Sequence, residues 1–181
     1  MRIISGKYKG HHLVSFQADH IRPTTDRVKE SLFNMIQGHI ESARVLDLFS
    51  GTGNLGLEAL SRGAREVLFV EKNRKSILIL EKNIEKLKVD EPYKILQKDV
   101  IGFLKNYDGP PFDLIFADPP FTEEMAHDVM VGADSSRVFH PGTLMMIESG
   151  RREKILEDYP TLTRYDLREF GDKFLSFFKK K

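Results

Sequence analysis

The segment Arg44–Gly56, RVLDLFSGTGNLG, decides the fold of this 181-residue chain. Residues 44–49 form an apolar run with the length of a buried strand, and residues 54–62 have the apolar spacing of a helix. The glycines between them match G-x-G-x-x-G, and Glu71 follows Gly51 by twenty residues. This spacing predicts a strand, a tight glycine loop and a helix, which together open an α/β sheet.

The rest of the chain continues to alternate between strand and helix patterns. Further strands are expected at 66–70, 93–96, 112–117 and 143–148, and helices at 73–88, 100–107 and 121–130. Such alternation predicts parallel strands joined by right-handed crossovers, with helices on both faces of the sheet. Residues 162–170 and 173–178 flank Gly171-Asp172 and predict an antiparallel pair at one edge. We therefore expect a Rossmann-like α/β fold with a mostly parallel, seven-stranded sheet.

The first forty residues follow a different pattern. Residues 2–5 and 12–16 predict a small hairpin, and Thr24 or Thr25 can cap the helix that follows. The apolar face of that helix would consist of Val28, Leu32, Phe33 and Ile36. We therefore divide the chain into an N-terminal appendage at 1–40 and a main domain at 41–181. Within the main domain, the polar segment 131–140 is hard to place.

Composition limits the classes of protein and site. The chain has no cysteine, which excludes disulfides, thiolate zinc sites and a cysteine nucleophile, and we expect no metal. No signal-peptide pattern opens the sequence, and no apolar run approaches the roughly 18 residues of a membrane span, so we expect a cytoplasmic protein. The net charge is only +1, so contact with nucleic acid would need a local patch. Arg2, Lys7 and Lys9 belong to one basic stretch, although a solvated surface explains such charges equally well.

The glycine loop alone fits either a nicotinamide dinucleotide or S-adenosylmethionine. Asp47 favours the second, because a carboxylate beside a helix N-terminus would repel a pyrophosphate and suit an ammonium and a sulfonium. Glu71 is placed for the ribose hydroxyls, and Asp99, after the third strand, for the adenine amino group. Asp47 could instead cap the loop, and Asp99 could cap the next helix.

Asp118-Pro119-Pro120-Phe121 follows the fourth expected strand directly. The two prolines predict a stiff extended turn, which would fix the Asp118 carboxylate and free the Pro119 carbonyl. Those two acceptors could hold both N–H groups of an exocyclic amine, whose lone pair is otherwise delocalised into the ring. Asp118 could also accept a proton, and Phe121 could stack on the base. The alternative is a plain turn with Phe121 in the core.

Taken together, these motifs resemble the class I methyltransferases that act on amino groups. RPTTDRVKESLFNMI at 22–36 and the opening RIISGKYKG narrow the likeness. They are similar to the bacterial RsmD family, which makes N2-methylguanine in small-subunit (16S) ribosomal RNA. The resemblance runs from Arg2 to about Glu148 and extends more loosely to the closing GDKFLSFF at 171–178. It implies S-adenosylmethionine as cofactor and ribosomal RNA as partner, within a partly assembled small subunit. Asn54 departs from it, because a small residue is expected there.

The resemblance implies three groups of site residues. The cofactor would be held by Asp47, Phe49, Ser50, Gly51, Gly53, Glu71, Lys72, Asp99, Val100 and Asp118. The target base would meet Asp118, Pro119, Pro120 and Phe121. Substrate RNA would contact Arg2, Lys7, Lys9, Arg22, Thr24 and Arg27.

Other activities share parts of this pattern. The same tetrad serves adenine N6 in DNA or RNA, and a glutamine amide in a protein. A nicotinamide-dependent oxidoreductase would fit the glycine loop, but Asp47 and the tetrad argue against it. A non-catalytic RNA-binding or assembly factor on the same fold is a further alternative, which the intact Asp118 disfavours.

Overall fold

The computed structural model describes residues 1–16, 26–120 and 123–181. The strands are β1 Arg44–Leu48, β2 Glu66–Glu71, β3 Tyr93–Gln97, β4 Phe112–Ala117, β5 Phe139–Gly150, β6 Leu162–Phe170 and β7 Lys173–Lys180. The helices are α1 Asp26–Met35, α2 Asn54–Ser61, α3 Arg74–Leu87, α4 Val100–Asn106 and α5 Ala126–Ser135, with a 3-10 turn η1 at Gln37–His39.

The seven strands form one sheet in the order β3-β2-β1-β4-β5-β7-β6. The first five strands are parallel to one another, and β7 runs antiparallel to both β5 and β6. The predicted Rossmann-like sheet with an antiparallel C-terminal edge pair is therefore confirmed. The strand order reverses between β1 and β4, because successive strands are added on one side of β1 and then on the other, so a crevice for ligands is expected where the carboxyl ends of these two strands meet.

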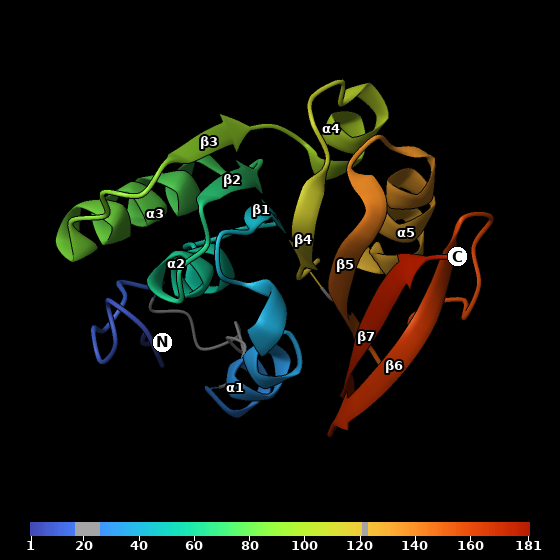
Figure 1. The fold of residues 1–181 in the computed structure, drawn as a ribbon, viewed down its shortest axis with the longest axis horizontal. Coiled ribbons are helices and arrows are strands. Elements are labelled where there is room, and N and C mark those ends of the chain that lie inside the picture. Colours follow the sequence, from blue (N-terminus) through green and yellow to red (C-terminus); the bar gives the residue numbers. More distant parts are fainter. Residues whose placement is uncertain (17–25, 121–122) are drawn as a thin grey trace.

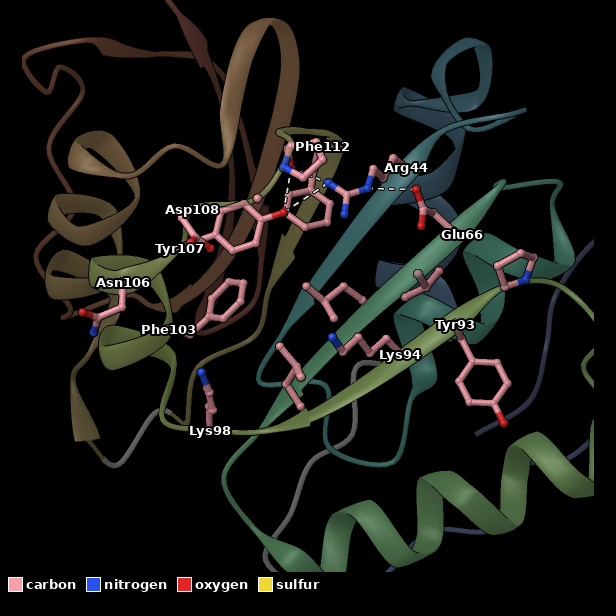
Figure 2. A pocket seen from close by; sticks show the side chains of 16 residues that line it. Arg44, Glu66, Tyr93, Lys94, Lys98, Phe103, Asn106, Tyr107, Asp108 and Phe112 are labelled. Atoms are coloured by element: carbon pink, nitrogen blue, oxygen red, sulfur yellow. Dashed lines mark hydrogen bonds and ion pairs between the residues drawn. The ribbon is translucent and has the colours of Figure 1, made fainter.

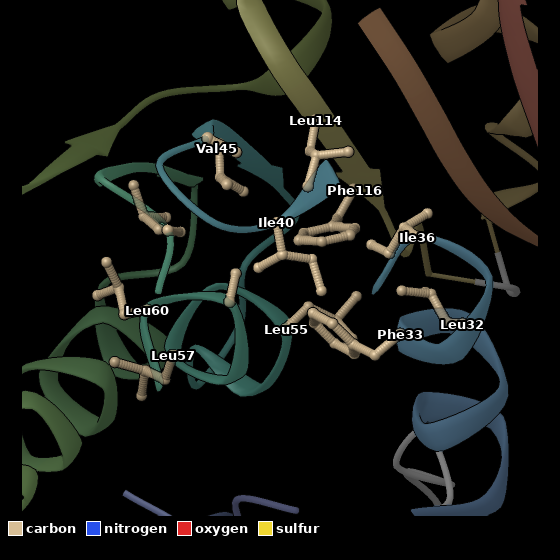
Figure 3. Close-up of a cluster of buried hydrophobic side chains, with 14 of the residues drawn as sticks. Leu32, Phe33, Ile36, Ile40, Val45, Leu55, Leu57, Leu60, Leu114 and Phe116 are labelled. Carbon is tan, nitrogen blue, oxygen red and sulfur yellow. The ribbon is translucent and has the colours of Figure 1, made fainter. Parts of the chain in front are cut away.

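Helices cover both faces of the sheet, as the alternating pattern predicts (Figure 1). One buried cluster joins α1, α2 and α3 to the sheet, and a second joins α4 and α5 to the opposite face. In the first cluster the rings of Phe33, from α1, and Phe116, from β4, lie 5.5 Å apart between centroids (Figure 3). Helix α1 is thereby fixed over the middle of the sheet.

Two elements differ from the sequence prediction by more than two residues at one end or both. The helix expected at 121–130 is α5 at Ala126–Ser135, and residues 121 and 122 lie outside the described part of the chain. Its buried side chains are Ala126, Val129, Met130 and Ala133, so the apolar stripe continues into the segment that was hard to place. The strand expected at 143–148 is longer in both directions, because it pairs with β4 on one side and β7 on the other.

The N-terminal appendage shares a core with the rest of the chain. The expected hairpin consists of a single bridge between Arg2 and His12, with backbone hydrogen bonds on either side of it. Ile3 and Leu13 belong to the same buried cluster as β1. The division at residue 40 stays a prediction, and the expected caps Thr24 and Thr25 lie outside the described residues.

A buried ion pair ties α1 to α2. Lys29 and Glu58 have 1% and 0% of their side chains exposed, and their charged atoms are 3.0 Å apart. Glu58 also accepts the backbone N–H groups of Ile4 and Ser5, while Lys29 donates to the side-chain oxygen of Asn54 at 2.9 Å. This contact explains why Asn54 stands where a small residue is expected.

Replacement of Lys29 by methionine should destabilise the fold. Lys29→Met keeps most of the side-chain volume but leaves Glu58 buried with one fewer cation, which costs about 3 kcal/mol in comparable buried pairs. Urea unfolding of the purified protein measures the loss. Lys82→Met, at an exposed position of α3, is the matched control and should change the free energy of unfolding by less than about 0.5 kcal/mol. A similarly small change for Lys29→Met would contradict the assignment.

Candidate functional site

Four carboxylates stand in a row at the carboxyl ends of four neighbouring strands. Glu71 ends β2, Asp47 lies one residue before the end of β1, Asp118 follows β4, and Glu148 lies near the end of β5. Electrostatic repulsion links Asp47 with both Glu71 and Asp118, and links Asp118 with Glu148. The row crosses the point in the sheet where ligands of α/β proteins bind.

Asp47 is buried and caps the helix that follows the glycine loop. Its Oδ2 accepts the backbone N–H of Gly56 at 2.8 Å. Burial raises its pKa to about 8, repulsion from Asp118 and Glu71 adds to this, and the Gly56 N–H partly offsets it. Asp47 therefore has a structural capping role through the Gly56 N–H, while its role toward a cofactor stays a prediction.

Glu71 braces the glycine loop against the end of β2. One carboxylate oxygen accepts the N–H of Gly51 at 2.9 Å, and the other accepts the N–H of Asn73 at 2.7 Å. A carboxylate has about four acceptor directions, so these two bonds leave capacity for the hydroxyl groups of a ligand.

The glycine loop leaves room for a ligand at Gly51. A Cβ there would meet only the Phe49 carbonyl, at 3.8 Å, whereas at Gly56 it would lie 2.3 Å from the ring of Phe69. Gly56 therefore serves close helix–strand packing, and Gly51 borders open space. The buried Ser50 hydroxyl has no hydrogen-bond partner among the described residues. An unpaired buried hydroxyl beside open space fits a polar ligand in this loop.

The remaining residues predicted to bind a cofactor differ in exposure. Asp99 is exposed at the end of β3 and caps α4, where its Oδ2 accepts the N–H of Gly102 at 2.8 Å. Val100 is buried in the second core cluster. Lys72 is exposed and forms an ion pair with Glu123 at 3.3 Å. The structure thus brings Asp99 to the same edge as Glu71, while Val100 supports the core.

Asp118 occupies the position predicted for a group that meets the substrate. Asp118 is partly exposed, whereas Pro119 after it is buried. The backbone N–H of Asp118 lies 3.5 Å from the Leu48 carbonyl. Asp118 therefore sits at the end of β4, between the two strands that carry Asp47 and Glu148. Phe121 lies outside the described residues.

Sequence reasoning missed Glu148. Its side chain is buried, and burial raises its pKa to about 7, with Asp118 adding to the shift and the ammonium of Lys173 opposing it. Lys173, at the start of β7, forms an ion pair with it. Ala117 pairs with Ile147 in the sheet, so the next residues of β4 and β5 lie side by side. The available signal was a carboxylate at or near the carboxyl end of each of four expected strands.

The predicted RNA-binding residues divide between the two edges of the sheet. Arg2 lies near the start of α1 and forms an ion pair with Asp26 at 2.8 Å. Lys7 pairs with Asp90 and Glu91, directly before β3, and its backbone bonds to the end of α2. Lys7 therefore lies at the amino ends of the strands, away from Asp118.

The other predicted RNA-binding residues can be placed only in part. Lys9 belongs to the same turn as Lys7, because its N–H bonds to the Gly6 carbonyl. Arg27 lies in the first turn of α1 and is exposed. Arg22 and Thr24 lie outside the described residues. Within the described ranges, no three side chains are grouped as metal ligands and no helix is long and apolar enough to cross a membrane.

Comparisons with known proteins agree with this geometry. A family model described as Conserved hypothetical protein 95 matches residues 1–179. The chain is 35% identical to the Ribosomal RNA small subunit methyltransferase D of Haemophilus influenzae, over 86% of this chain and 82% of that protein. It is 33% identical to YlbH, a proposed ribosomal RNA methyltransferase of Bacillus subtilis, over 100% of both. The solved structure of yhhF, a proposed methyltransferase of Escherichia coli, matches with a TM-score of 0.88 at 28% identity, over 100% of this chain and 98% of that one. The fold is therefore that of the class I methyltransferases.

The protein without a bound ligand should lose stability as the pH rises from about 5 to about 8, with little further loss from Asp47 above that range. Folding raises the pKa of Asp47 to about 8, from about 4 when exposed. A group with a raised pKa stabilises the fold while it is protonated, and this contribution is lost as the pH rises through the folded pKa. Thermal melts across this range measure the effect.

Asp47→Asn is the informative comparison for that pH dependence. The amide oxygen can still accept the Gly56 N–H, but the side chain cannot ionise. The melting temperature of the variant should therefore fall less steeply between about pH 5 and 8. Identical slopes for the two proteins would show that Asp47 does not titrate in this range.

Proposed function

The chain belongs to the Conserved hypothetical protein 95 family, also called the RsmD family, and from this premise we propose that it is a ribosomal RNA methyltransferase. The proposed reaction moves a methyl group from S-adenosylmethionine to the exocyclic N2 amine of a guanine in small-subunit RNA. The observation that carries the proposal is the row Glu71, Asp47, Asp118 and Glu148 beside an open glycine loop.

The charges of the site favour this cofactor over a nicotinamide dinucleotide. S-adenosylmethionine carries an ammonium and a sulfonium, and it supplies an activated methyl group. Asp47 and Glu71 would hold its cationic and ribose groups, with the space at Gly51 and the Ser50 hydroxyl available to it. A pyrophosphate in the same place would meet the row of carboxylates with the same sign of charge.

Asp118 and the Pro119 carbonyl would hold the target amine, and Asp118 would deprotonate it. Two acceptors on its two N–H groups would turn the nitrogen lone pair away from the ring and toward the methyl carbon. Asp118 would take the proton that the nitrogen loses once it carries the methyl group. Glu148, beside Asp118, is held by Lys173, so the two carboxylates keep a fixed relation.

The choice of guanine N2 in ribosomal RNA rests on the relatives. One is named a small-subunit ribosomal RNA methyltransferase and another a proposed ribosomal RNA methyltransferase. The chemistry at Asp118 alone would equally serve adenine N6 or a glutamine amide. A partly assembled small subunit suits the net charge of +1, because ribosomal proteins could supply part of the contact surface. Such a substrate would place the protein in the cytoplasm.

The first test is incubation with S-adenosylmethionine and immature small subunits that lack the modification. Nucleoside mass spectrometry should then detect a gain of N2-methylguanosine. A gain of N6-methyladenosine would keep the proposed chemistry and overturn the target base. Absence of any methylated nucleoside, with S-adenosylmethionine still bound in calorimetry, would overturn the RNA substrate.

Asp118→Asn should separate catalysis from cofactor binding. The variant keeps an acceptor oxygen but loses the proton acceptor, so kcat should fall by about 100-fold or more, while S-adenosylmethionine affinity changes little. Asp128→Asn, which neutralises an exposed carboxylate on α5, is the matched control and should leave kcat unchanged.

Glu71→Ala should weaken S-adenosylmethionine binding more than it lowers kcat. It removes the acceptor of the Gly51 and Asn73 N–H groups, so cofactor affinity should fall first. An Asp118→Asn variant that loses cofactor affinity as strongly as Glu71→Ala would contradict the separate roles.

A further inference from the structure

A shallow groove runs between α1 and the edge strand β6. It has a volume of about 470 Å³ and is lined by Arg27, Glu30, Ser31, Asn34, Met35 and Arg168. The neighbourhood of α1 and the β6–β7 pair can be followed in Figure 1. Among the described residues, the lining contains none of the four carboxylates of the candidate site, and Arg27 is the one described lining residue that was expected to contact RNA.

The two walls of the groove follow from the periodicity of each element. On α1 the lining positions 27, 30, 31 and 34 recur at intervals of three and four, so they form one exposed stripe. The buried stripe of α1 includes Val28, Leu32 and Phe33. On β6, Arg168 pairs with Leu175, whose buried side chain belongs to the cluster beneath α1. Arg168 therefore projects to the side of the sheet that α1 covers.

The groove opens at the edge of the sheet that carries the candidate active site. Leu175, opposite Arg168, pairs on its other side with Glu148, so Arg168 lies level with the end of β5. On the other wall, the start of α1 is held beside the glycine loop, because Lys29 bonds to Asn54. A strand that presents a base to Asp118 can continue into the groove.

The charges of the groove suit phosphate. Arg27 is exposed, and Arg168 forms an exposed ion pair with Asp166 at 2.9 Å. Exposed pairs of this kind contribute little, so a phosphate can replace Asp166 as the partner of the guanidinium. Glu30 is the one acid in the lining.

An aromatic side chain, Tyr165, precedes Arg168 by three residues in β6. Tyr165 is 39% exposed, and its ring contacts Phe177, which belongs to the cluster beneath α1. The ammonium of Lys179 lies 5.7 Å from the centre of that ring. Basic groups with an exposed aromatic ring are the combination that binds single-stranded nucleic acid, by phosphate contact and base stacking.

We propose that this groove binds the backbone of the RNA strand that flanks the target nucleotide. Arg27 and Arg168 contact phosphates, and Tyr165 offers a ring on which a flanking base stacks. The inference rests on the proposed function, because it takes RNA as the substrate. It adds Arg168, Tyr165 and Lys179 to the residues that meet RNA.

A second pocket provides the matched control. It has a volume of about 390 Å³ and lies against β2 and β3 on the face covered by α4, with Lys94 and Lys98 in its wall (Figure 2). Arg44 in the same pocket is already bonded to Glu66, Tyr107 and the Pro110 carbonyl. Its lining includes the starts of β1, β2, β3 and β4 and, at Lys98, the residue that follows β3, so the pocket lies on the other face of the sheet from the groove.

The test compares two double substitutions that remove the same charge. Arg27→Gln with Arg168→Gln alters the groove, and Lys94→Gln with Lys98→Gln alters the second pocket. The probe is immature small-subunit RNA, free and in particles, with affinity measured at several salt concentrations. The groove variant should bind about tenfold more weakly, and its salt slope should fall by about 1.4, which corresponds to two lost phosphate contacts on a single strand. The lysine variant should match the wild-type protein, and S-adenosylmethionine affinity should not change in either variant.

Three outcomes would overturn the proposal. The first is equal RNA affinity and salt slope in both variants. The second is a loss confined to particles, which would assign the groove to a ribosomal protein. The third is a wild-type protein that binds no RNA. Methylation of particles by the wild-type protein tests the proposed function separately. If the wild-type protein methylates particles but the groove variant binds RNA normally, only the proposal for the groove is refuted.

Discussion

Repulsion among four carboxylates governs the edge of the sheet where the strands end. Glu71, Asp47, Asp118 and Glu148 come from strands that are adjacent in the sheet but scattered along the chain. Local contacts offset the repulsion at three of the four acids: burial raises the pKa of Asp47 and favours its neutral form, two backbone N–H groups bond to Glu71, and an ammonium pairs with Glu148. A cationic ligand would relieve the whole row at once, so the fold carries an electrostatic preference before any ligand arrives.

The parts predicted well from the sequence are those with local signals. The glycine loop, the position of Asp118 directly after β4 and most element boundaries each depend on a short run of residues. The role of Glu148 in the site was not predicted, because Glu148 reaches Asp118 only when β4 and β5 are neighbours in the sheet, and no single segment of the sequence encodes that pairing. The buried ion pair of Lys29 and Glu58 was not predicted for the same reason. A lysine and a glutamate on two helices are expected to face solvent unless the packing of the helices is known.

The capping roles of Asp47 and Asp99 do not exclude the ligand-binding roles predicted for them. Asp47 and Asp99 each cap a helix through one oxygen, the structural role considered beside ligand binding. A carboxylate has a second oxygen and further lone pairs, so capping and recognition can coexist. Capping also fixes the carboxylate before a ligand binds, which lowers the entropy cost of binding.

The contact between Lys29 and Asn54 has a consequence for how this sequence can diverge. The ammonium is enclosed, and its acceptors come from Glu58, Asn54 and the backbone of Arg2. A small apolar residue at position 54 would remove one acceptor where water has little access. Positions 29, 54 and 58 are therefore expected to change together among relatives, and a chain that returns to glycine or alanine at 54 should also carry a shorter or uncharged side chain at 29.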